Sequence, residues 1–386
     1  MAEPAQSPDA ASERGRLREV ALVFLRLGTT AFGGPAAHVA LMQEELVERR
    51  RWVDRARFLD LLGAVNLIPG PNSTEMAIHL GYIRAGWPGL VVAGACFILP
   101  AALMVSAIGW AYVTYGALPD ATAVLAGLKP VVLVVVADAL VKFARTAVKG
   151  WFQGALATAA LAAAALRADE LVVLAAAGLV AAFRAGALRG RTAVLAPLPI
   201  ALAAVPVTAA AAATPAGLFW VFAKIGSVLF GSGYVLLAFL RAELVERLHW
   251  LTTPQLLDAI AVGQVTPGPL FTTATFVGWI AAGPAGAAAA TAGIFLPAFV
   301  FVALSGPLVT RIRASPIAGA FLEGVTLASL ALMALVTVQL GLDALGSPGS
   351  WAIGAVAAAL LLGFRVSSAW LVIGGAAAGW AIHFLR

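Results

Sequence analysis

The sequence predicts an all-α, polytopic membrane protein with two homologous halves, arranged as an inverted-topology repeat with broken or re-entrant helical hairpins. Its 386 residues are 61% hydrophobic and 11% charged, with a mean hydropathy of +0.95, whereas soluble domains carry about 25% charged residues. Long runs of Ala, Leu and Val indicate helices rather than a barrel. Pro-Gly-Pro occurs at 69–71 and again at 267–269, and a shift of 198 residues aligns the two halves.

The repeat extends well beyond this tripeptide. The charged pentapeptide 45–49 (ELVER) recurs at 243–247, and Phe32-Gly33 recurs as Phe230-Gly231. After a gap of one residue, Pro100 aligns with Pro297. Such a run of identities at one offset indicates an internal duplication. We therefore divide the chain into a disordered tail (1–15), a first repeat (16–213) and a second repeat (214–386).

Each half is expected to open with two broken segments. In the first half, 18–50 breaks at Gly33-Gly34-Pro35 and 56–84 breaks at Pro-Gly-Pro. Proline lacks an N–H group and disfavours α geometry in the preceding residue, so these motifs interrupt a helix. Arginines flank both ends of each segment, which places those ends in the cytoplasm and makes each segment a re-entrant hairpin. The alternative is that each break interrupts a full span.

Simpler spans follow the broken segments in both halves. In the first half we place them near 87–112, 121–142, 151–167, 171–186 and 192–212. The second half repeats the pattern, with hairpins at 216–247 and 254–281 and spans near 284–308, 317–341, 349–364 and 366–385. Five spans in the first half make the number odd, so the halves would face opposite sides of the membrane.

The two Pro-Gly-Pro breaks, at 69–71 and 267–269, are the centre of the predicted site. A break inside a bilayer is tolerated only where the backbone is buried in protein or lines a wet cavity, and paired breaks in matching halves indicate a transport site. Residues after each break would begin helices whose free N–H groups and dipole attract anions. The candidate ligands at the breaks are Gly33, Gly34, Asn66, Gly70, Asn72, Ser73, Thr74, Gln264, Gly268 and Thr272. For Asn72 and Ser73, the alternative is helix capping alone.

Charged residues inside apolar segments add further candidates. Lys129 lies within a predicted span, where insertion of a charge costs about 2.5–3.5 kcal/mol, so it is a candidate for binding an anion. Arg26 and its repeat mate Lys224 form a second cationic pair. Glu75, just after the first break, and Glu323 are the proton-coupling candidates. The alternative for Lys129 and Glu323 is that both lie near a membrane surface and extend toward water.

Other ionisable residues, including Asp60 and its repeat mate Asp258, are interpreted as structural. Glu45 and Arg49, and their mates Glu243 and Arg247, have the i,i+4 spacing of ion pairs on a helix. Isolated histidines such as His38 are interpreted as hydrogen-bonded side chains. Four scattered His and one Cys do not provide a metal site. The sequence also lacks a His-Glu-x-x-His motif and a phosphate-binding Gly-Lys-Ser/Thr loop, so neither an intramembrane enzyme nor a nucleotide-driven pump is expected.

The motifs of the first half resemble those of the CHR family of chromate transporters. They are Phe32-Gly33-Gly34-Pro35 with Ala37-His38, Pro69-Gly70-Pro71-Asn72-Ser73, Gly81-Tyr82, Gly86 and Phe97-Ile98-Leu99-Pro100. The second copy is looser, with Ser232-Gly233 in place of Gly-Pro, and is similar to the second domain of the family's long members. The resemblance covers nearly the whole chain beyond its N-terminal tail.

This resemblance implies a multi-pass protein of a prokaryotic inner membrane that exports chromate, is coupled to the proton-motive force and confers chromate resistance. The expected partners are chromate, protons and the lipid bilayer, with a homodimer as a further expectation and no nucleic acid, cofactor, metal or catalytic residue. Sulfate or another tetrahedral oxyanion is an alternative substrate, and an anion channel is an alternative mechanism.

Overall fold

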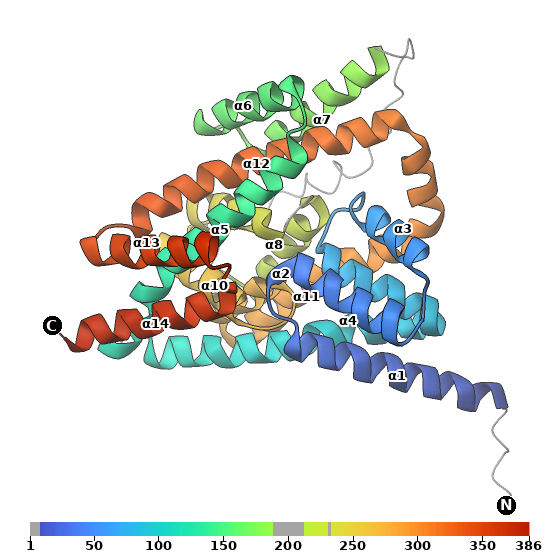
Figure 1. Cartoon of the computed structure of the whole chain (residues 1–386), viewed down its shortest axis with the longest axis horizontal. Helices are drawn as coiled ribbons and strands as arrows, with labels where there is room; N and C mark the ends of the chain where they lie inside the picture. Colours follow the sequence, from blue (N-terminus) through green and yellow to red (C-terminus); the bar gives the residue numbers. More distant parts are fainter. Residues whose placement is uncertain (1–7, 117, 188–211, 231–232, 386) are drawn as a thin grey trace, which may run out of the picture.

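The computed structural model describes residues 8–116, 118–187, 212–230 and 233–385, and these are helical with no strand among them (Figure 1). The first half contains α1 (Pro8–Thr30), α2 (Gly34–Met42) continuing into a π-helical segment (Gln43–Arg49), α3 (Arg55–Val65), α4 (Asn72–Tyr115), α5 (Pro119–Ala147), α6 (Trp151–Ala165) and α7 (Glu170–Ala187).

The second half repeats this order. It contains α8 (Pro215–Val228), a 3-10 turn (Gly233–Val235), α9 (Leu236–Leu240) continuing into a π-helical segment (Arg241–Arg247), α10 (Thr253–Val265), a 3-10 turn (Leu270–Thr272), α11 (Thr273–Ala314), α12 (Pro316–Ala344), α13 (Pro348–Gly363) and α14 (Ser368–Phe384). The two homologous halves predicted from the sequence are therefore present as two similar sets of helices.

Backbone angles repeat along with the helices. The long helix α4 kinks at Ala85–Gly86, where Gly86 has φ 63°, and α11 kinks at Ala282–Gly283, where Gly283 also has φ 63°. These positions match under the repeat alignment. A positive φ is accessible to glycine and strained for other residues, so the glycine at each kink allows the chain to turn there. The predicted boundary between 84 and 87 thus coincides with Ala85 and Gly86, whose backbone angles are not helical and at which two helical stretches of α4 meet.

The predicted breaks lie where the motifs placed them. Gly33 and Gly34, with φ 104° and 77°, separate α1 from α2. Gly70 and Gly268, with φ 137° and 92°, separate α3 from α4 and α10 from α11. Glycine supplies these backbone angles, and the neighbouring prolines prevent a continuous helix. Whether the broken pairs are re-entrant hairpins stays a prediction, as does the inversion of the halves across the membrane.

Each half completes its packing on the other half. Gly127 of α5 lies directly against Gly375 and Gly379 of α14, and its repeat mate Gly324 of α12 lies against Ala177 and Ala181 of α7. In Figure 1, α12 runs beside α6 and α7, and α5 lies beside α13 and α14. Small residues allow these helices to approach closely, as is typical of membrane bundles. The two halves are therefore interlocked rather than placed side by side.

Five described helical stretches are long and apolar enough to cross a membrane: Asn72–Tyr115, Pro119–Ala147, Glu170–Ala187, Leu270–Leu304 and Pro316–Ala344. Large apolar side chains such as Leu103, Trp151 and Leu342 are exposed, which fits contact with lipid. The predicted spans over 121–142, 151–167, 171–186, 317–341, 349–364 and 366–385 all coincide with helices. The span expected over 192–212 lies almost wholly outside the described residues.

One expectation differs at the N-terminus. Residues 1–15 were expected to form a disordered tail, but α1 begins at Pro8. Proline is well tolerated in the first turn of a helix, and the Ala, Glu, Arg and Leu residues that follow it are good helix formers. The expectation for residues 1–7 concerns a stretch outside the described residues.

Candidate functional site

The two Pro-Gly-Pro breaks, which we call the half-one break (69–71) and the half-two break (267–269), meet at the interface between the halves through reciprocal hydrogen bonds. The N–H of Gly70 donates to the carbonyl oxygen of Leu229 (2.8 Å), and the N–H of Gly268 donates to the carbonyl oxygen of Ala31 (2.9 Å). Both glycines and both acceptors are repeat mates at the offset of 198 residues. Each break is therefore anchored on the end of the first helix of the other half.

Polar side chains lie on the first turn of α4, directly after the half-one break. Asn72 Nδ2 donates to Asn66 Oδ1 (2.6 Å), and Ser73 Oγ contacts His38 Nδ1 (3.3 Å). Among the described residues, no side chain caps the start of α4. The alternative that Asn72 and Ser73 serve only as caps is therefore not what the structure shows. The N–H groups of Thr74 and Glu75 donate to the Pro71 carbonyl oxygen (2.8 and 3.0 Å), which among the described residues leaves those of Asn72 and Ser73 for an anion.

Two further side chains on this turn are buried without partners. Thr74 and Glu75 are each 0% exposed, and neither the Thr74 hydroxyl nor either carboxyl oxygen of Glu75 has a hydrogen-bond partner among the described residues. A buried polar atom without a partner costs about 1–3 kcal/mol. A β-carbon on Gly70 would overlap Oε1 of Glu75, so the carboxyl group lies directly against the break. This turn therefore has unused capacity to bind a polar ligand or a proton.

The half-two break has the same kind of backbone turn but lacks most of these polar side chains. Leu270 and Phe271 occupy the positions of Asn72 and Ser73. The hydroxyl of Thr272, mate of Thr74, donates to the Pro269 carbonyl (2.8 Å), and that of Thr273, mate of Glu75, donates to the Leu270 carbonyl (2.8 Å). Gln264 is the exception, since its side-chain Nε2 is buried without a partner in the described part of the chain. Polar binding capacity is thus concentrated at the first break.

Lys129 is ion-paired across the two halves. Its Nζ lies 3.2 Å from Asp258 Oδ1, and the Tyr112 hydroxyl donates to the other oxygen of Asp258 (3.0 Å). The Lys129 side chain is 21% exposed and the Asp258 side chain is 4% exposed. The mate of Lys129 is Thr326, so this pair has no second copy. Lys129 therefore tethers α5 to α10.

The other proton candidate, Glu323, lies elsewhere. It is exposed on α12 and accepts a hydrogen bond from Gln153 Nε2 of α6 (3.1 Å). Its hydrogen bond thus joins two helices outside the broken segments. Glu75 is the candidate that the structure brings to a break.

Arg26 and Lys224 line two cavities that are related by the repeat. Arg26 borders a cavity of about 230 Å³, together with Leu27, Thr30, Glu45 and Arg49. Lys224 borders a cavity of about 890 Å³, together with the mates of these residues: Ile225, Val228, Glu243 and Arg247. The first cavity thus reaches the last turn of α1, next to Ala31, and the second reaches the end of α8, next to Leu229. Each cavity ends beside a helix terminus that anchors a break.

Ion pairs line the larger cavity. Lys224 Nζ lies 3.5 Å from Glu243, and Arg247, one turn further along the same segment, also pairs with Glu243. Arg241 pairs with Glu246 (2.9 Å) and with Asp343 of α12 (3.5 Å). The predicted i,i+4 pairs are confirmed here and in the first half, where Arg49 lies 3.6 Å from Glu45. Lys224 is therefore not a free cation in this structure.

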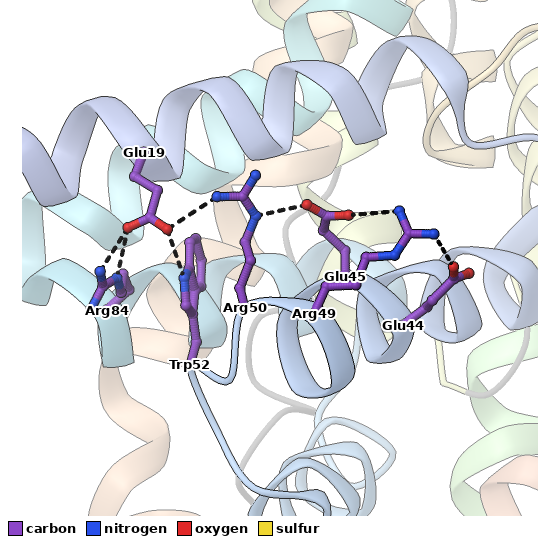
Figure 2. Close-up of polar contacts among 7 residues, drawn as sticks. All are labelled: Glu19, Glu44, Glu45, Arg49, Arg50, Trp52 and Arg84. Atoms are coloured by element: carbon purple, nitrogen blue, oxygen red, sulfur yellow. Dashed lines mark hydrogen bonds and ion pairs between the residues drawn. The ribbon is translucent and has the colours of Figure 1, made fainter.

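The smaller cavity lies beside a chain of charges that the second half lacks (Figure 2). Glu19 of α1 accepts hydrogen bonds from Arg84 of α4 (2.7 and 3.1 Å), from Arg50 (3.1 Å) and from Trp52 (3.1 Å). Arg50 continues the chain to Glu45 (2.7 Å). The mates of Glu19, Arg50 and Arg84 are Gly217, Leu248 and Ala281. This network, which we call the Glu19 clamp, therefore joins α1, α4 and the segment after α2 in the first half and has no counterpart at the mirrored positions.

Three residues of the site were not selected from the sequence. His38 was interpreted as an ordinary hydrogen-bonded histidine, Asp258 as structural, and Tyr112 was not considered. The signal for His38 and Asp258 was their position inside apolar segments that also carry a break motif. The described residues contain no group of His, Cys, Asp and Glu that could hold a metal ion.

Comparison with known proteins gives consistent matches over the chain. The family model for chromate transporters matches residues 18–182 and again 216–380, an offset of 198 residues. A chromate transport protein of Cupriavidus metallidurans is 33% identical over 374 residues, which cover 94% of this chain and 92% of the relative. A probable chromate transport protein of Synechococcus elongatus is 32% identical over 357 residues, covering 88% of each chain.

A third relative, a chromate transport protein of Pseudomonas aeruginosa, is 34% identical over 330 residues, covering 82% of this chain and 79% of the relative. No solved structure gives a significant match. The double match of the family model agrees with the two halves seen in the structure, and the apolar helices agree with a multi-pass membrane protein of a prokaryote. This chain therefore belongs to the chromate transporter family.

Proposed function

We propose that this protein exports chromate across the inner membrane, is driven by the proton-motive force and thereby confers chromate resistance. The direction follows from the charge of the substrate. A membrane potential of 100 mV, negative inside, is worth about 2.3 kcal/mol for each charge, so a dianion gains about 4.6 kcal/mol on leaving the cell. Protons moving inward through the same carrier would add to this driving force.

The observation that carries the proposal is the asymmetry between the two breaks. Thr74 and Glu75 are buried, and their side-chain oxygens have no partner in the described part of the chain, whereas their mates Thr272 and Thr273 donate to backbone carbonyls. A buried polar group without a partner requires an explanation, and a bound ion that completes its hydrogen bonds is one such explanation. We therefore assign one oxyanion site to each chain, at the first turn of α4, and not one to each repeat.

The site offers what a tetrahedral dianion requires. The uncapped N–H groups at the start of α4 and the helix dipole supply donors and positive potential. The amide of Asn72 and the hydroxyl of Thr74 supply further donors, and Gly70 lets the anion approach the backbone closely. Glu75 is the group that we propose exchanges a proton during transport, because its carboxyl group adjoins the break and is fully buried.

The two mirrored cavities support alternating access. Each borders the helix end that anchors a break, one at α1 and one at α8. In an inverted repeat they would open toward opposite sides of the membrane. The Glu19 clamp borders the smaller cavity, and its absence from the other half agrees with the larger volume there. A fixed anion channel would need a continuous pore, whereas these cavities are separate.

Uptake of radiolabelled chromate into everted membrane vesicles tests this function. Energised vesicles containing the protein should accumulate chromate, a protonophore should abolish the accumulation, and vesicles without the protein should show none. Excess unlabelled sulfate then tests the alternative substrate by competition. Accumulation of sulfate without chromate would assign the other oxyanion, and movement of neither ion would contradict an oxyanion carrier.

A further inference from the structure

His38 bridges the two breaks from a buried position that carries a leucine in the other half. Its side chain is 1% exposed and lies edge-on to Phe97. Nε2 lies 3.2 Å from the carbonyl oxygen of Ala31, and Nδ1 lies 3.3 Å from the hydroxyl of Ser73. The mate of His38 is Leu236, which is also fully buried. The mirrored helix therefore forms with an apolar side chain at this position.

The carbonyl oxygen of Ala31 connects His38 to both halves. It accepts the Gly268 N–H from the half-two break (2.9 Å) as well as the contact from His38. A carbonyl oxygen has two lone pairs and can take both hydrogen bonds. The left-handed glycines Gly33 and Gly34 fold α2 back over the end of α1, which brings His38 to Ala31. His38 thus connects the start of α4 with the anchor point of the opposite break.

The hydrogen bonds fix which nitrogen carries the proton in the neutral ring. A carbonyl oxygen can only accept, so Nε2 must carry the hydrogen and donate it to Ala31. Nδ1 is then an acceptor, and the Ser73 hydroxyl must donate to it. Ser73 Oγ has no other hydrogen bond in the described structure. Its hydroxyl hydrogen is therefore committed to His38 and is not available to a bound anion.

We propose that His38 is a positioning residue: by holding the hydroxyl of Ser73 and the carbonyl of Ala31 together, it fixes the first turn of α4 against the half-two break. Ser73 then contributes its backbone N–H to the oxyanion, and not its hydroxyl. This inference rests on the proposed function for its effect on transport. The tautomer and the hydrogen bond to Ser73 do not depend on that function.

Four variants separate positioning from a purely structural role. His38→Leu installs the residue of the mirrored position, His38→Gln keeps a donor and an acceptor, Ser73→Ala removes the hydroxyl, and His38→Leu with Ser73→Ala combines two losses. His38→Leu and Ser73→Ala should each raise the KM for chromate about five- to tenfold, the effect of one buried hydrogen bond. The double variant should be no worse than His38→Leu, and His38→Gln should recover most of the loss.

The result that overturns the proposal is a set of additive effects, or an unchanged KM in folded His38→Leu protein. Leu236→Met, a buried apolar exchange at the mirrored position, is the control and should leave the KM unchanged. If the unmodified protein transports no chromate, the proposed function fails, whereas the tautomer of His38 can still be measured by NMR.

NMR of protein with isotope-labelled histidine, assigned by comparison with His38→Leu, should show a ring protonated at Nε2. Protonation at Nδ1 would refute the hydrogen-bond assignment.

Discussion

Gly268 donates its backbone N–H to the carbonyl oxygen of Ala31, and the chain repeats this relationship in reverse between Gly70 and Leu229. Each break is thereby fixed to the end of a helix in the other half. A shift of α1 would displace the half-two break, and a shift of α8 would displace the half-one break. The hydrogen bonds thus supply a physical connection between the two cavities and the site.

Alanine at Gly70 or Gly268 should abolish transport. Both glycines have a positive φ, which costs an alanine about 1–3 kcal/mol. The new methyl group would also overlap Glu75 at the first position and contact Ala101 at the second. Thermal unfolding of the purified variants, followed by chromate transport, checks this expectation. Gly319→Ala is the control, because a β-carbon there meets nothing within 4 Å; chromate transport and stability equal to those of this control in either glycine variant would contradict the expectation.

Replacing Glu75 with glutamine should uncouple transport from the pH gradient. An amide has nearly the shape of the carboxyl group but does not exchange a proton in this pH range. Chromate accumulation driven by an imposed membrane potential should persist in vesicles, whereas an added pH gradient should no longer change its rate. Thr273→Ser at the mirrored position serves as the control and should respond as the unmodified protein does. A Glu75→Gln protein that still responds to the pH gradient would exclude Glu75 as the coupling group.

The pair between Lys129 and Asp258 gives a test that separates stability from substrate binding. Lys129→Met should destabilise the protein by about 3–5 kcal/mol, because it leaves a buried carboxylate unpaired. Lys129→Met combined with Asp258→Asn should recover most of that loss. If Lys129 also binds chromate, the stable double variant should still fail to transport it. Full transport by the double variant would limit Lys129 to a structural role.

The Glu19 clamp should make the half-one side sensitive to acid. Burial raises the pKa of Glu19, but hydrogen bonds from Arg84, Trp52 and Arg50 outweigh this and lower its pKa below the ordinary value. A carboxyl group whose pKa is lower in the folded protein stabilises the fold at a pH above the pKa that it has in the unfolded chain. This stabilisation is lost as the pH falls through the folded-state pKa. Unfolding temperatures measured from neutral to acidic pH should therefore converge for the unmodified protein and Glu19→Gln.

At neutral pH, Glu19→Gln should cost about 1 kcal/mol, since the partners are partly exposed. Glu48→Gln, an exposed exchange outside the clamp, is the matched control. A constant difference between Glu19→Gln and the unmodified protein at every pH would refute the electrostatic origin of the effect.

Much of the architecture could be predicted because the repeat offset carries structural information. The identities at 198 residues located both breaks, the mirrored ion pairs of Glu45 and Glu243, and the matching helices. The glycine and proline motifs predicted interruptions for local reasons of backbone geometry, which need no knowledge of tertiary contacts. The family resemblance, too, depended on these same local motifs and is confirmed.

The interactions within the site could not be predicted in this way. His38 and Ser73 are 35 residues apart, and Tyr112 and Asp258 are 146 residues apart. Their pairing depends on how helices far apart in the sequence pack together, and local sequence patterns do not reveal that packing. The repeat alignment also does not indicate the partner of Lys129, which is Asp258 in the structure.

Mirrored substitutions at Thr74 and Thr272 test most directly whether the oxyanion site belongs to the first half alone. Valine has the shape of threonine without its hydroxyl. Thr74→Val removes a buried hydroxyl that has no partner among the described residues and should leave stability equal or higher, whereas Thr272→Val removes a hydrogen bond to Pro269 worth about 1 kcal/mol. Both variants would be measured for unfolding temperature and for chromate accumulation in the same everted vesicles.

The asymmetry predicts opposite outcomes for the two variants. Thr74→Val should lose chromate transport about tenfold without loss of stability, and Thr272→Val should keep transport while becoming less stable. Equal loss of transport in both, or loss in Thr272→Val alone, would contradict a single oxyanion site at the first turn of α4.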